Sequence, residues 1–280
     1  MEEQEMKKSE NFVHVGDFTK GLEGPAVDKN GNLYFVNYQK SGTIGRVDTD
    51  NNVTIYVELP EGSTANGIRI NKQGELFLAD YTGHNVLKIN PETKEVSVHA
   101  HDSTMNQPND LAITDDGYIY ASDPNWAAET GNLWMITPEG TITRLEENMG
   151  TTNGIEVSPD NKTLYVNQSV QRNVFAYDIN EDKTVSNKRL LIQFDDYGMD
   201  GMRCDVEGNL YIARYDKGVI AKVSPDGNLL EEIQLTGKKV TNIAFGGPEG
   251  KQCYITTQDN EYLETFKVET PGRAWKMLHE

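Results

Sequence analysis

Short runs of alternating apolar and polar residues recur six times along the chain. Each repeat opens with a polar residue, usually followed by glycine, and continues into an apolar alternating run. A turn containing glycine, a second apolar run, a loop and further alternating runs complete the unit. Alternation with a period of two predicts β-strands, and no segment keeps a helical period. The openings lie 42 to 47 residues apart, at Glu23, Asn66, Asn109, Asn153, Asp200 and Asn242.

The second run of each repeat is the most uniform part of the unit. These runs cover residues 33–36, 76–79, 118–121, 164–166, 210–213 and 253–255. Four short antiparallel strands in each of six units predict an all-β fold, a six-bladed β-propeller, because radial repetition leaves only short strand edges. A β-sandwich is the alternative, but six copies of one four-strand unit suit it poorly.

The two ends of the repeat array predict how the ring closes. The sixth unit has no clear fourth strand after Val268, whereas the run at residues 12–15 precedes the first unit and has no blade of its own. We therefore expect the N-terminal run to complete the last blade. The prediction is one domain over residues 1–280, with residues 1–10 as a flexible tail.

The charge of the chain narrows the choice of partners. It carries 44 acidic against 26 basic residues, a formal net charge of −18. Nucleic acids and anionic membranes reward clusters of Lys and Arg, so neither is expected as a partner. No run approaches the roughly 20 apolar residues of a membrane-spanning helix. We expect a small molecule or a cation as the ligand, and a monomer or weak dimer.

The termini and the cysteines bear on the compartment. Residues 1–10 lack the apolar core of a signal peptide, which favours a cytoplasmic location, although a secreted or periplasmic form with its signal removed would look the same. Cys204 and Cys253 both lie in apolar runs. Two buried thiols are therefore expected, with one disulfide as the alternative.

The six opening residues carry the candidate chemistry. Innermost strands of a propeller run along the central channel, so equivalent positions face one another at one mouth. Here they supply two carboxylates and four amides. Oxygen on short side chains suits a hard cation such as Ca²⁺, and two carboxylates on one axis would repel each other without a counter-charge. No histidine or cysteine stands at these positions to favour zinc.

Tight turns are the competing interpretation of the same residues. Asn-Gly and Asp-Gly are strong hairpin signals wherever they occur. In this chain they fall at one phase of the repeat, just before the first strand, where the link from the preceding unit is not a tight hairpin. This common phase favours a ring of ligands.

The order of the strands also predicts which loops surround this mouth. The loop after each second strand and the link between units should lie beside the ring. This places Tyr215 and Gln258, from loops, and Met199, from a link, around the entrance. Asp123 and Trp126 belong to the longest such loop, and Gln107 belongs to a link. With Asn66 and Asn109 of the ring, they are the residues we expect to bind substrate. No nucleophile elbow or phosphate loop is present in the sequence, which argues against covalent serine catalysis.

Several runs resemble the gluconolactonase and senescence-marker-protein (regucalcin) family. They are Leu22-Glu23-Gly24-Pro25, Pro108-Asn109-Asp110, Asn153-Gly154, Asp200-Gly201 and Phe245-Gly246-Gly247-Pro248. The resemblance covers roughly residues 21–268 and implies a propeller lactonase. It also implies one divalent cation, usually Ca²⁺ with Zn²⁺, Mn²⁺ or Mg²⁺ as alternatives, held by Glu23, Asn153 and Asp200. Asn109 matches a position that binds the metal in some members and the substrate in others.

The resemblance also implies a reaction. The position matching Asp200 is commonly the general base, so the expected activity is metal-dependent hydrolysis of a small sugar-type lactone. Asp200 would activate water or attack directly, and both routes stay open. Gln107 stands where many sugar lactonases have Arg, which predicts weaker use of acidic lactones than of neutral ones. The alternatives are a phosphotriesterase-like hydrolase and a non-catalytic calcium-binding propeller.

Overall fold

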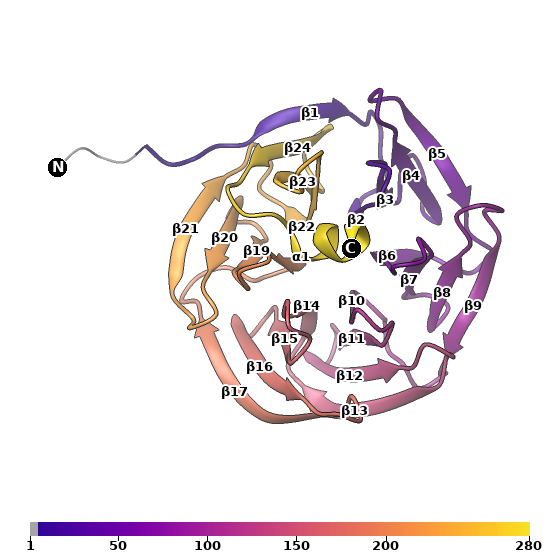
Figure 1. Ribbon diagram of the computed structural model, residues 1–280, viewed down its shortest axis with the longest axis vertical. Helices are drawn as coiled ribbons and strands as arrows, with labels where there is room; N and C mark the ends of the chain where they lie inside the picture. The colour runs from indigo at the N-terminus through magenta and orange to yellow at the C-terminus, as the bar shows by residue number, and fades with distance from the viewer. Residues whose placement is uncertain (1–4) are drawn as a thin grey trace.

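Six β-sheets surround a central axis in the computed structural model, which describes residues 5–280 (Figure 1). Each sheet has four antiparallel strands, with the first strand of a blade nearest the axis and the last at the rim. The structure confirms the predicted six-bladed β-propeller. Among the described residues, no helix is long and apolar enough to cross a membrane.

The first three blades follow chain order from axis to rim. Blade one contains β2 (Glu23–Val27), β3 (Leu33–Val36), β4 (Thr43–Val47) and β5 (Val53–Glu58). Blade two contains β6 (Ala65–Ile70), β7 (Leu76–Asp80), β8 (Asn85–Ile89) and β9 (Val96–His101). Blade three contains β10 (Leu111–Ile113), β11 (Ile119–Asn125), β12 (Thr130–Ile136) and β13 (Ile142–Met149).

The last three blades repeat this plan, and only the sixth borrows a strand. Blade four contains β14 (Thr152–Val157), β15 (Thr163–Gln168), β16 (Asn173–Ile179) and β17 (Val185–Gln193). Blade five contains β18 (Met202–Cys204), β19 (Leu210–Arg214), β20 (Val219–Val223) and β21 (Leu229–Gln234). Blade six contains β22 (Val240–Gly246), β23 (Gln252–Thr257), β24 (Tyr262–Lys267) and, outermost, β1 (Glu10–His14).

The N-terminal strand closes the ring, as predicted. β1 pairs antiparallel with β24, so the first strand of the chain is the fourth strand of the last blade. Before β1, the backbones of Lys7 and Ser9 hydrogen-bond to Gln234 of β21, one blade further round. These bonds attach Lys7 and Ser9 to blade five, whereas the flexible tail expected over residues 1–10 stays a prediction. Residues 1–4 lie outside the described part.

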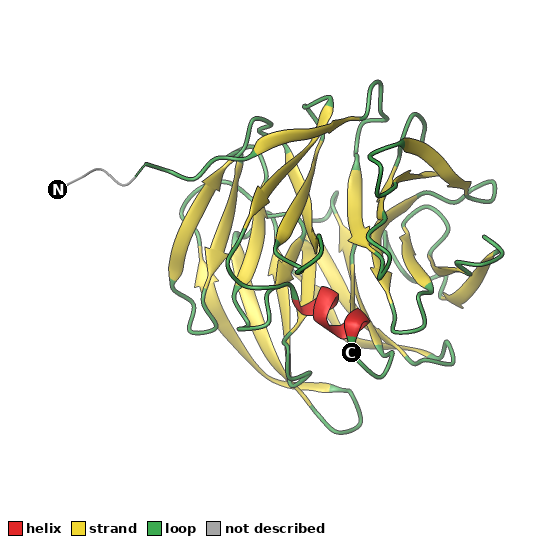
Figure 2. Ribbon diagram, turned by 45° about the horizontal axis from the view of Figure 1, so that its top comes forward, coloured by secondary structure: helices red, strands yellow, loops and turns green. Residues whose placement is uncertain are grey.

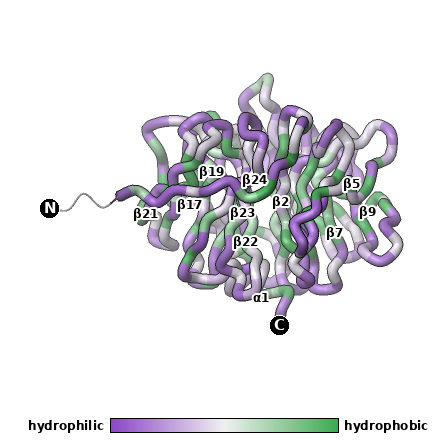
Figure 3. The backbone as a smooth tube through the Cα atoms, turned by 90° about the horizontal axis from the view of Figure 1, so that it is seen from above, coloured by the Kyte–Doolittle hydropathy of each residue, from purple (hydrophilic) through white to green (hydrophobic). Residues whose placement is uncertain are grey.

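Burial falls from the axis to the rim. The second strands β3, β7 and β19 are buried throughout, because neighbouring blades pack on both of their faces. The fourth strands β5, β9 and β17 leave many residues exposed. Seen from the side, the backbone alternates between hydrophilic and hydrophobic positions (Figure 3). The expected buried thiols are present, since Cys204 and Cys253 are both buried and free.

Helix α1 (Arg273–His279) was not predicted. It packs at one end of the propeller, near the axis (Figures 1 and 2). Arg273 is buried and donates to the carbonyl of Ile113 at 2.8 Å, at the far end of β10 from the ring position Asn109. The helix therefore covers the channel at the end opposite the ring residues.

Candidate metal and active site

Five of the six ring residues line one cavity at a mouth of the channel. The cavity has a volume of about 340 Å³. Its ring residues are Glu23, Asn66, Asn109, Asn153 and Asp200. They come from successive blades and meet because each lies within two residues of the start of an innermost strand.

Glycine after a ring residue allows neighbouring blades to approach each other closely. A Cβ atom on Gly24 would stand 2.3 Å from the carbonyl oxygen of Asn66, and one on Gly154 would stand 2.4 Å from that of Asp200. In both cases the clash is with the ring residue of the next blade. The dipeptides that resemble hairpin signals therefore allow the ring residues to converge.

Three ring side chains each leave one buried oxygen without a hydrogen-bond partner. These atoms are Oε1 of Glu23, Oδ1 of Asn109 and Oδ1 of Asn153. An unsatisfied buried polar atom typically costs about 1–3 kcal/mol, so three together point to a missing positive partner. With the carboxylate of Asp200 they form an oxygen-only set of the kind Ca²⁺ prefers. The residues present therefore fit a divalent cation.

Only two of the four proposed ligands, Glu23 and Asp200, carry a carboxylate. Among residues 5–280 there is no group of three or more His, Cys, Asp and Glu side chains placed to hold a metal. That result agrees with the proposed set, because two of its four members are amides. The amide oxygens add coordination without adding negative charge.

The two ring carboxyl groups resist ionising together. Burial raises the pKa of Asp200 to about 7. Burial also raises the pKa of Glu23 well above its ordinary value, and repulsion from Asp200 and Asp110 raises it further. A bound cation reverses this effect, because it stabilises both carboxylates.

Asn242, the sixth ring residue, lies beneath the cavity. It is fully buried, and its Nδ2 donates to Oε2 of Glu23 at 3.0 Å and to Oδ2 of Asp110 at 3.1 Å. Asp110 in turn pairs with Arg203 at 3.1 Å. This chain of contacts fixes one oxygen of Glu23 and leaves the other free at the ring. The sequence predicted Asn242 among the ring residues at the mouth. In the structure it lies below them and holds Glu23 in place by a hydrogen bond.

Comparison with known proteins settles the family. Residues 4–259 match the family described as SMP-30/Gluconolactonase/LRE-like region. The chain belongs to this family. The resemblance seen in the sequence is thus confirmed.

Relatives of this chain include proteins named for different activities. A gluconolactonase from Zymomonas mobilis is 26% identical over 274 residues, spanning 85% of this chain and 76% of that protein. A diisopropyl-fluorophosphatase from Loligo vulgaris is 24% identical over 294 residues, spanning 94% and 93%. The solved structure of a calcium-binding protein, regucalcin, from Agrobacterium tumefaciens has a TM-score of 0.83 at 20% identity, covering 95% of this chain and 96% of that one. The last comparison supports the fold alone.

The residues expected to bind substrate divide into two groups. Trp126 lines the cavity with 43% of its surface exposed, together with Asn66 and Asn109. Gln107 is exposed and Asp123 is fully buried, and neither lines the cavity. Asp123 instead accepts hydrogen bonds from the backbone N–H of Gln107 at 2.7 Å and from Trp134 Nε1 at 2.9 Å. Its role here is to hold the link between blades two and three.

Four further residues line the cavity, of which only Ser169 was not placed around the mouth from the sequence. They are Ser169, Met199, Tyr215 and Gln258. Three of them directly follow the second strand of their blade, as does Trp126. We call Trp126, Ser169, Tyr215 and Gln258 the second tier. Met199, Tyr215 and Gln258 were expected around the mouth but were not chosen as substrate-binding residues. Ser169 stands at the same position after a second strand as Tyr215 and Gln258.

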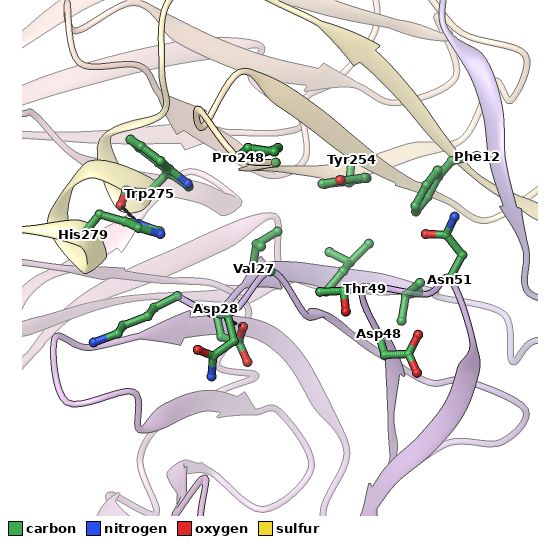
Figure 4. A pocket seen from close by; sticks show the side chains of 16 residues that line it. Phe12, Val27, Asp28, Asp48, Thr49, Asn51, Pro248, Tyr254, Trp275 and His279 are labelled. Carbon is green, nitrogen blue, oxygen red and sulfur yellow. Dashed lines mark hydrogen bonds between the residues drawn. The ribbon is translucent and has the colours of Figure 1, made fainter.

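A second cleft lies between blades one and six, beside α1 (Figure 4). It also measures about 340 Å³, and Trp275, Tyr254 and Phe12 form one wall. The carboxylates of Asp28 and Asp48 on the other wall already accept backbone hydrogen bonds within their own turns. None of the buried oxygens without partners belongs to this cleft. The ring cavity is therefore the candidate active site.

Proposed function

We propose that this protein is a divalent-cation-dependent lactonase that opens a small sugar-type lactone, with Ca²⁺ as the favoured cation. The observation that carries the proposal is the convergence of three unpaired buried oxygens with Asp200 in one cavity. The kinship with a gluconolactonase over most of the chain supports lactones as the substrate class. An expected cytoplasmic location and a monomeric or weakly dimeric state remain part of the proposal.

Glu23, Asn109, Asn153 and Asp200 would hold the cation. When bound, it supplies the positive charge that polarises the lactone carbonyl and stabilises the developing oxyanion. Asn66 and Trp126 line the part of the cavity that the lactone would occupy. Of the ten lining residues only Glu23 and Asp200 carry charge, which favours a neutral substrate.

Asp200 is the residue that we propose moves the proton. Its carboxylate takes a proton from water as the water oxygen bonds to the carbonyl carbon. The ring C–O bond then breaks, and the leaving oxygen receives a proton to give the open hydroxy acid. Direct attack by the Asp200 carboxylate is the alternative. In that route the ring C–O bond breaks to give an acyl-Asp200 anhydride, which water then hydrolyses. A single turnover in ¹⁸O-water that puts label into the Asp200 side chain identifies direct attack, with water opening the anhydride at the Asp200 carbon.

A chelation experiment with matched variants tests the proposal. Hydrolysis of a six-carbon aldonolactone, corrected for the spontaneous rate, should disappear with chelator and return with added Ca²⁺. Asp200→Asn, with its metal occupancy measured separately, should lose activity mainly in kcat. Asp226→Asn is the control, because Asp226 is exposed in the turn after β20 and lies outside the cavity. Full activity in verified metal-free protein would contradict the proposal.

A phosphotriesterase is the second candidate function. It is favoured by the likeness to a diisopropyl-fluorophosphatase, which extends over nearly the whole of both chains. The same ring oxygens would hold a cation against a P=O group. Running a neutral fluorophosphate beside the lactone in the same assay decides between them. Faster turnover of the fluorophosphate would replace the lactone as the substrate.

A further inference from the structure

The second tier differs in chemistry from one side of the cavity to the other. Tyr215 and Gln258 stand on blades five and six, and the Tyr215 hydroxyl donates to Oε1 of Gln258 at 2.7 Å. Trp126 stands on blade three, across the axis from blade six (Figure 1). The cavity therefore has a polar wall facing an aromatic one.

The hydrogen bond between Tyr215 and Gln258 leaves a defined set of groups for a ligand. It occupies the amide oxygen of Gln258, so the amide Nε2 remains as a donor. Burial raises the pKa of Tyr215, with the negative charges of Asp216 and Asp200 adding to the effect, so its hydroxyl stays protonated and donates to Gln258. The lone pairs of that hydroxyl remain as acceptors. A donor and an acceptor side by side match one alcohol group of a ligand.

Resting on the proposed function, we infer that Tyr215 and Gln258 are specificity-determining residues that recognise a ring hydroxyl of the lactone. The substrate hydroxyl accepts from Gln258 Nε2 and donates to the Tyr215 oxygen. Trp126 packs on the C–H face of the same ring. A site built to pair a hydroxyl discriminates against an analogue without one, since its own polar groups then stay unpaired.

Repeat symmetry supplies a matched control for this pair. Tyr81 is the equivalent residue of blade two, directly after β7, yet it does not line the cavity. Asn37 is the equivalent residue of blade one, but it is 4% exposed and donates to the Gly21 carbonyl at 3.3 Å. Tyr81→Phe thus makes the same chemical change at the same repeat position, away from the substrate.

The experiment compares glucono-1,5-lactone with δ-valerolactone, which has the same ring without hydroxyls. Tyr215→Phe and Gln258→Leu should each lower kcat/KM for the hydroxylated lactone about tenfold or more, mainly through KM. Both variants should hydrolyse δ-valerolactone within about twofold of wild type. Tyr81→Phe should leave both substrates unchanged.

Two kinds of result overturn the inference. If kcat/KM of Tyr215→Phe and Gln258→Leu falls equally for both lactones, the pair is structural. If kcat/KM falls for neither lactone, the pair does not touch the substrate. In both cases the proposed lactonase activity stands. If the calcium-loaded wild type hydrolyses neither lactone, the proposed function fails and this inference fails with it.

Discussion

At the scale of single residues, the ring is less symmetric than its six-fold repeat. Asn66 and Asn242 occupy equivalent positions, but Asn66 faces the cavity and Asn242 lies under it. The difference follows from Asp110, which stands where most repeats have glycine. Its carboxylate, paired with Arg203, gives Asn242 a buried acceptor and draws its amide downward. Asn242 then positions Glu23.

Asn242→Ala should weaken cation binding about 10- to 100-fold, the usual effect of removing a group that orients a ligand. Glu23 would lose the donor at 3.0 Å that fixes its orientation. Asn66→Ala is the matched comparison and should weaken binding less, because the Asn66 amide donates to the Asn109 backbone carbonyl and not to Glu23. Titration calorimetry with Ca²⁺ measures both. Equal losses in the two variants would mean that Asn242 has no special role in holding Glu23.

At the scale of elements, the sequence predicts the inner strands and the N-terminal closing strand well, but not the C-terminal helix. Strands such as β7 and β19 are apolar up to their last residue, Asp80 or Arg214, because blades pack on both faces, and that pattern is visible in one repeat. Helix α1 spans seven residues, too few for a helical period to stand out. The burial of Asp123 could not be predicted from the sequence either. It depends on contacts with Trp134 and with the backbone of the link between blades two and three.

Packing between blades also predicts a pH effect. His99 of β9 lies edge-on to Phe77, with ring centroids 5.0 Å apart, and its Nε2 stands 3.2 Å from the Thr137 carbonyl of blade three. Burial lowers the pKa of His99 in the folded state. The unfolded chain therefore binds this proton first as the pH falls, and the free energy of unfolding should decrease below about pH 6.5.

The variant His99→Gln keeps a donor near Thr137 and removes the titrating group. Its free energy of unfolding should fall less between pH 7 and pH 5 than that of wild type. Urea denaturation at the two pH values provides the measurement. His101→Gln, at an exposed site of the same strand, is the matched control for replacing an imidazole by an amide. A wild-type slope in His99→Gln would assign the acid sensitivity to other groups.

At the scale of the whole molecule, one buried carboxylate joins the segments that meet where the ring closes. Glu264 of β24 is fully buried and accepts four hydrogen bonds. Its donors are the Ser9 hydroxyl at 2.6 Å, the Thr236 and Gly237 backbone N–H groups at 2.8 and 2.9 Å, and the Asn260 amide at 3.0 Å. It thereby joins the N-terminal segment, the link after blade five and the last blade.

Glu264→Gln should lower the free energy of unfolding by about 3 kcal/mol, because an amide N–H₂ replaces one acceptor and leaves buried donors unpaired at about 1–3 kcal/mol each. Ser9→Ala removes one donor from the same carboxylate and should cost only about 1 kcal/mol. Glu264→Gln should also weaken cation binding, because blade six contacts the metal site. Its Thr241 hydroxyl donates to the carbonyl of Leu22, the residue before Glu23, at 2.8 Å. Thermal unfolding and calcium titration of both variants measure the two effects. Unchanged stability in Glu264→Gln would show that the pairing of β1 with β24 closes the ring without this carboxylate.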